Sequence, residues 1–203
     1  MQKKKLTIKL LIECAKEFCE TESKFKNKDL FGITDGKAVG TYIEHKFKEF
    51  VTSKYDLIVG NSASGIDLPS AEINTDIKVT SIKQPQSSSP FKNAQQKIWG
   101  LGYNLLLFVY DKKDNSDDQT TILEFVSCSF IEKDRTADFQ ITTTLNQMIK
   151  NNANIDDIFA YLNDRNIPAD EITLNQLAKQ IIKTRIERKY IKQIFRTKIE
   201  SQN

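Results

Sequence analysis

GIDLPSAEINTDIKVTS, residues 65–81, combines two aspartates with a lysine, and in its second half polar and apolar residues alternate. Side chains two positions apart on an extended strand share a face. We therefore expect Asp76 and Lys78 to project from one side while Ile77 enters a core. Turn-favouring residues separate the aspartates and predict a bent hairpin, with Asp67 on the neighbouring strand. Two acids and one amine would then meet where oxygen ligands can hold a divalent metal ion beside an ammonium group.

A helix is expected before this hairpin, starting near Thr34 or Asp35, because either residue can cap its first turn. Apolar residues at helical spacing predict its buried face: Val39, Ile43, Phe47 and Phe50. Glu44 falls at the margin of that face. Its carboxylate is either a solvated salt-bridge partner or a third acid for the site.

The segment after the hairpin, IKQPQSSSPF at 82–91, contains two prolines that exclude a central strand or a helix. It carries polar groups that can reach phosphates or base edges: Lys83, Gln84, Gln86 and Ser87. The alternative is an ordinary polar surface loop.

Strands and a helix are expected next. Residues 90–100 predict a short helix that ends at glycines. NLLLFVYD at 104–111 is a continuous apolar run, typical of a strand buried on both faces at the centre of a mixed sheet. A polar loop at 111–119 and a further strand at 121–130 should follow.

The character of the chain changes after residue 141, where three helices are expected at 142–151, 155–164 and 173–199. The last combines an apolar stripe with many lysines and arginines. Such a helix can lie on a DNA backbone, or it can present a solvated face on a helix used for dimerisation.

Length and composition favour a globular protein: 203 residues suffice for one full core with a small appendage. A net charge of +3 is too small to identify a nucleic-acid partner. No apolar run approaches the roughly 20 residues that span a bilayer, and no signal-peptide cleavage site follows the basic start, so we expect a cytoplasmic protein. Three cysteines and one histidine without ligand spacing predict structural thiols.

This order of elements resembles the core of the PD-(D/E)XK nuclease superfamily. GID at 65–67 stands where that family has its first acid, with Ile66 in place of proline, and DIK at 76–78 matches the second half of the motif. TDGKAVGTYIEHKF at 34–47 looks like small type II restriction endonucleases in particular. The resemblance covers roughly residues 34–130. It implies an α/β (α+β) fold with a restriction-endonuclease-like mixed central sheet flanked by helices. We expect a nuclease core with an N-terminal helix over 1–140. The C-terminal helices have no assignment from the resemblance, and we expect them to form a helical subdomain over 141–203 for DNA contact or dimerisation.

The resemblance also implies roles for individual residues. Asp67, Asp76 and the Ile77 carbonyl would hold Mg²⁺, for which Mn²⁺ can substitute. Lys78 would stabilise the charge that develops during attack on the phosphate, and Glu44 would bind a second metal ion or an ordered water. The implied activity is cleavage of double-stranded DNA at a specific sequence to give 5′-phosphate and 3′-hydroxyl ends. A homodimer is implied, in a bacterial or archaeal cytoplasm at the nucleoid, with neither a membrane nor a nucleotide cofactor.

Two other functions fit the same sequence. A repair, junction-resolving or mobile-element nuclease would keep the fold and change the substrate. A non-catalytic DNA-binding regulator would use the C-terminal helices, although the connection between the last two is longer than the 3–4 residues of a helix-turn-helix.

Overall fold

The computed structural model describes residues 3–60, 65–85 and 90–184. These residues form two compact units, one within 1–87 and 104–131 and the other within 88–103 and 132–203. The structure thus groups 88–103 with the helices that follow residue 131, whereas the sequence suggested one boundary at residue 140.

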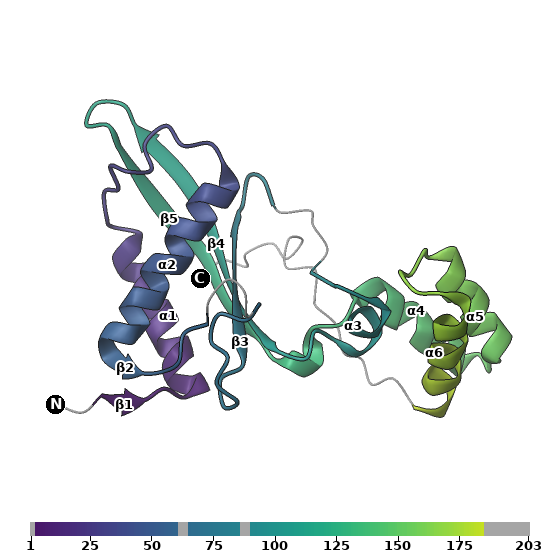
Figure 1. Ribbon diagram of the computed structural model, residues 1–203. Helices are drawn as coiled ribbons and strands as arrows, with labels where there is room; N and C mark the ends of the chain where they lie inside the picture. The colour runs from purple at the N-terminus through teal and green to yellow at the C-terminus, as the bar shows by residue number, and fades with distance from the viewer. Residues whose placement is uncertain (1–2, 61–64, 86–89, 185–203) are drawn as a thin grey trace, which may run out of the picture. The chain divides into compact units, whose positions relative to one another are not determined.

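A three-stranded mixed sheet forms the centre of the first unit (Figure 1). Its strands are β3 (Thr75–Ser81), β4 (Asn104–Asn115) and β5 (Thr120–Ile131), in the order β3-β4-β5. β3 runs parallel to β4, and β4 runs antiparallel to β5. Residues 104–110 of the central strand are all buried, as the apolar run predicted. The mixed α/β architecture expected from the sequence is therefore confirmed.

Two helices pack against this sheet. α1 (Ile8–Glu22) contacts β5 and α2 (Gly36–Lys54) contacts β3. The predicted start of the second helix is correct, because the Asp35 side chain caps it by accepting a hydrogen bond from Lys37 N at 3.0 Å. β2 (Tyr55–Asp56) directly follows the C-terminal end of α2 and forms a short parallel pair with β1 (Lys4–Lys5).

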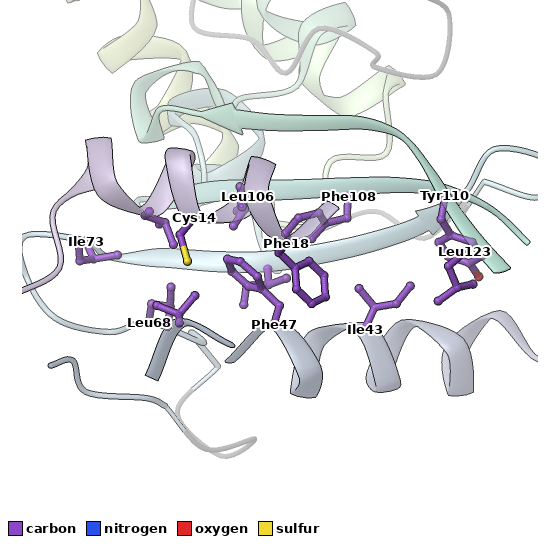
Figure 2. Close-up of a cluster of buried hydrophobic side chains, with 14 of the residues drawn as sticks. Cys14, Phe18, Ile43, Phe47, Leu68, Ile73, Leu106, Phe108, Tyr110 and Leu123 are labelled. Carbon is purple, nitrogen blue, oxygen red and sulfur yellow. The ribbon is translucent and has the colours of Figure 1, made fainter. Parts of the chain in front are cut away.

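The core between helices and sheet is built around aromatic side chains (Figure 2). The Phe47 ring of α2 lies 5.2 Å from that of Phe18 on α1 and 5.0 Å from that of Phe108 on β4, both edge to face. All three side chains are almost fully buried. This cluster fixes α2 on the sheet, so the polar residues at the margin of its buried face are held beside β3.

The hairpin expected at 65–81 is shorter than predicted. A single antiparallel bridge joins Leu68 to Thr75, with both N–H···O distances at 3.0 Å. Between them Ser70 O accepts hydrogen bonds from the N–H groups of Ile73 and Asn74, and Asn74 adopts a positive φ of 37°. The chain therefore turns back tightly, and Asp67 lies just outside the bridge and not within a strand.

The second unit is helical. It contains α3 (Ala94–Trp99), a 3₁₀ turn η1 (Lys133–Arg135), α4 (Phe139–Lys150), α5 (Ile155–Asp164) and α6 (Glu171–Lys183). The three helices predicted after residue 141 are present, with α4 and α6 beginning a few residues early. The last helix was predicted to run unbroken to residue 199, but α6 ends at Lys183 because Thr184 has an extended backbone (φ −105°, ψ 111°). The rest of that prediction, 185–199, lies outside the described residues. No helix in the described part of the chain is both long and apolar enough to span a bilayer.

Candidate active site

Asp76 and Lys78 project from the same side of β3, as strand alternation predicts. The Lys78 ammonium lies 2.6 Å from Asp76 Oδ2. The Asp76 side chain is 8% exposed, whereas that of Lys78 is 46% exposed. Ile77, between them, is buried in the hydrophobic core. The strand thus places a buried carboxylate beneath an amine that reaches the surface.

Asp67 is brought to the same place by the tight turn. Its Oδ2 accepts a hydrogen bond from the Ile77 backbone N–H at 2.8 Å, and its carboxyl group lies close enough to that of Asp76 for each acid to shift the pKa of the other. The two acids predicted to converge therefore do so, although a single bridge, and not a full strand pair, aligns them.

These contacts shift the pKa values of the two acids in opposite directions. Burial raises the pKa of Asp76 to about 6; the neighbouring Asp67 adds to the rise, and the Lys78 ammonium opposes it. Burial also favours the protonated form of Asp67, but hydrogen bonds from Lys48 and from Ile77 N outweigh it and lower the pKa of Asp67. A proton bound by the pair therefore resides on Asp76.

Lys48 is a site residue that sequence reasoning missed. Its ammonium lies 2.5 Å from Asp67 Oδ1 and 2.6 Å from Glu44 Oε1. It follows Glu44 by four residues on α2, a spacing that puts both on one face of a helix. That spacing was available in the sequence; the contact with Asp67 depends on how α2 packs against β3. Glu44 thus joins the cluster through Lys48.

The donor set suits a hard divalent cation. Mg²⁺ is usually bound through one or two carboxylates and keeps several waters or substrate phosphates as its other ligands. The adjoining carboxylates of Asp67 and Asp76 meet that requirement, with the backbone carbonyl of Ile77 as the ligand that the resemblance adds. Among the described residues no group of three or more acidic, histidine or cysteine side chains is placed to hold a metal ion. Glu44, the expected third acid, has Lys48 between it and Asp67.

Comparison with known proteins identifies the family. The family model described as "Type II restriction enzyme NspV" matches residues 5–194. The chain belongs to this family. It is 49% identical over 178 residues to the type II restriction enzyme NspV of Nostoc sp. (strain ATCC 29411 / PCC 7524), an alignment that covers 88% of this chain and 80% of that protein. No solved structure matches the chain. The resemblance to small type II restriction endonucleases is confirmed.

The NspV-family match includes every residue of the cluster on α2 and β3. It also includes the loop predicted to contact DNA, of which the structure describes the first part. Lys83 is exposed and pairs with Asp111 Oδ1 at 2.7 Å, and Gln84 is exposed beside it. Gln86 and Ser87 lie outside the described residues.

Proposed function

We propose that this NspV-family chain is a metal-dependent endonuclease that cuts double-stranded DNA at a specific sequence and leaves 5′-phosphate and 3′-hydroxyl ends. The observation that carries the proposal is the pairing of Asp67 with Asp76 next to the Lys78 ammonium. Family membership supports the restriction activity over repair and regulatory roles.

Hydrolysis of a phosphodiester is slow because its negative charge repels nucleophiles. Asp67 and Asp76, with the Ile77 carbonyl, would hold Mg²⁺, or Mn²⁺ in its place. Bound there, the ion supplies Lewis-acid chemistry by polarising the phosphate and lowering the pKa of a bound water. The Ile77 N–H holds Asp67 in position for this task.

Lys78 has the second role in the proposed mechanism. Its half-exposed ammonium lies at the outer edge of the buried acid pair, where a phosphate of the DNA backbone can reach it. A fixed positive charge at this point stabilises the negative charge that develops on the non-bridging oxygens during attack. It also compensates part of the cost of ionising Asp76 in a buried setting.

The loop after β3 is the proposed DNA contact, through Lys83, Gln84, Gln86 and Ser87. Support comes from its place directly after the strand that carries Asp76 and Lys78, and from the exposure of Lys83 and Gln84. We also propose a homodimer, because a two-fold symmetric enzyme matches the symmetry of a palindromic DNA site. The C-terminal helices are candidates for either interface.

Digestion of bacteriophage DNA by the purified protein with Mg²⁺ tests this function. Discrete fragments are expected, and sequencing of their ends should give one recognition sequence with 5′-phosphates and 3′-hydroxyls. Preference for branched DNA over linear duplex would support the junction-resolving alternative instead. A folded preparation that leaves every duplex uncut, whichever divalent ion is supplied, would overturn the proposal.

The raised pKa of Asp76 predicts how metal binding depends on pH. Because the pKa of Asp76 is about 6 without metal, the acid must lose a proton to bind a cation below that pH. Mn²⁺ affinity of the DNA-free protein should therefore change little from pH 8 to 7 and fall about tenfold per pH unit below 6. Titrations from pH 5 to 8 measure this, and an affinity that stays constant down to pH 5 would contradict it.

The same shift fixes the sign of the effect on stability. The unfolded chain gives an aspartate a pKa of about 3.9, and the fold raises that of Asp76 to about 6. Protonated Asp76 therefore favours the folded state. This contribution to stability is fully present below about pH 3.9 and is lost as the pH rises through about 6. Ionised Asp76 thus destabilises the metal-free protein at neutral pH. Added Mg²⁺ should raise the melting temperature more at pH 8 than at pH 5.

A further inference from the structure

The position of Lys48 is unusual for a helix lysine. It is bound by two carboxylates from different parts of the fold, Glu44 on its own helix and Asp67 beside β3, and its side chain is only 15% exposed. Lys54, also on α2, instead pairs with the exposed Glu17 of α1. Lys48 is therefore directed into the acidic cluster.

Two contacts hold Asp67. The Ile77 N–H binds Oδ2 and the Lys48 ammonium binds Oδ1, so each carboxylate oxygen has its own donor. Asp67 is largely buried, and an ionised carboxylate in such a place requires a compensating charge or hydrogen bonds. Lys48 supplies that charge from within the protein.

Charge balance limits how many cations the cluster accepts. Three carboxylates (Glu44, Asp67, Asp76) face two ammonium groups (Lys48, Lys78), a formal net charge of −1 when all are ionised. One divalent ion changes this to a net positive charge that suits a phosphate. A second would need a position near Glu44 and Asp67 Oδ1, which the Lys48 ammonium occupies, and like charges at such distances repel strongly.

We propose that Lys48 takes the place of a second metal ion: it binds Glu44, orients Asp67, and leaves one divalent ion per chain at Asp67 and Asp76. The inference rests on the proposed function and refines it by setting the metal count. Lys48 is a positioning residue that acts through Asp67. Glu44 contributes by holding Lys48 and is not itself a metal ligand.

Counting bound Mn²⁺ on the DNA-free protein tests this. Electron paramagnetic resonance measures the Mn²⁺ that remains free, and the difference from the total added gives the bound ion. We expect one bound Mn²⁺ per wild-type chain. Lys48→Met keeps much of the side-chain length but removes the charge, which frees Glu44 and one oxygen of Asp67, so this variant should bind two. Lys48→Arg should restore one. The matched control, Lys54→Met, removes a charge from the same helix away from the cluster and should also bind one.

A simple structural role for Lys48 would not change the number of ions. Two Mn²⁺ on the wild-type chain, or one on a Lys48→Met variant with a native circular dichroism spectrum, would overturn the proposal. If Lys48→Met does not fold, Glu44→Gln provides the test. Because Glu44 is not a metal ligand in this proposal, the variant should still bind one Mn²⁺, with its affinity for the ion lowered less than about fivefold. Loss of the ion from that variant would contradict the inference. None of these outcomes depends on DNA cleavage, so failure here is distinguishable from failure of the digest.

Discussion

Replacement of Asp76 by asparagine is expected to reduce DNA cleavage by at least about 1,000-fold, because an amide cannot supply the charge that holds a divalent ion beside the phosphate. Single-turnover cleavage of plasmid DNA in Mg²⁺ measures this loss. DNA binding, followed by gel shift without divalent ions, should persist, since the Asp76 side chain is almost fully buried and Lys78 beside it is the more exposed group.

The same variant should be more stable than the wild type when metal is absent. The buried Asp76 is costly to ionise, as its raised pKa shows, and asparagine removes that cost. Thermal unfolding at pH 8 should therefore give a higher midpoint for Asp76→Asn, and added Mg²⁺ should no longer stabilise it. Asp56→Asn, on the exposed end of β2, is the matched control and should change neither cleavage nor stability. Cleavage above about a tenth of the wild-type rate would rule out Asp76 as an essential ligand.

Lys78→Met should reduce single-turnover cleavage by about 100- to 1,000-fold while the protein still binds its divalent ion. Methionine retains much of the side-chain length, so the loss reports the missing ammonium. Lys78 also lowers the pKa of Asp76. Its removal should therefore raise that pKa further and shift the pH at which Mn²⁺ binding weakens to a higher value.

Lys83→Met is the control for Lys78→Met, because Lys83 is an exposed lysine in the loop just after the same strand. Lys83→Met should weaken DNA binding and make that binding less dependent on salt concentration. Its cleavage rate at saturating DNA should be close to that of the wild type. Lys78→Arg, which keeps the charge, should recover part of the lost activity. Full activity of Lys78→Met in Mg²⁺ would show that the catalytic site has been assigned to the wrong residues.

Local sequence signals predicted much of the fold. The apolar run at 104–111 identified the central strand because a strand buried on both faces has no polar side to mark it. Its continuation to Asn115 was missed, since the polar end of the strand resembles a loop. The helix predicted over 90–100 begins later than expected, at Ala94. The Asn93 side chain caps it there by accepting a hydrogen bond from Gln96 N.

The candidate site was predictable to the extent that it depends on one segment. The alternation of Asp76, Ile77 and Lys78 placed the acid and the amine on one side of a strand. The tight turn before it was read as a longer hairpin, because sequence alone does not show how many residues pair. Lys48 and Asp67 are 19 positions apart in the chain. They meet only because the aromatic core around Phe47 and Phe108 packs α2 against the sheet. Long-range packing of this kind is not visible in local patterns.

The most direct test of the metal site is a crystal structure of the protein soaked in Mn²⁺, with the ion located by its anomalous scattering. One peak per chain is predicted, in contact with the carboxylates of Asp67 and Asp76, with Lys48 still between Glu44 and Asp67. A fully occupied ion bound elsewhere, with the Asp67 and Asp76 pair empty, would contradict the account.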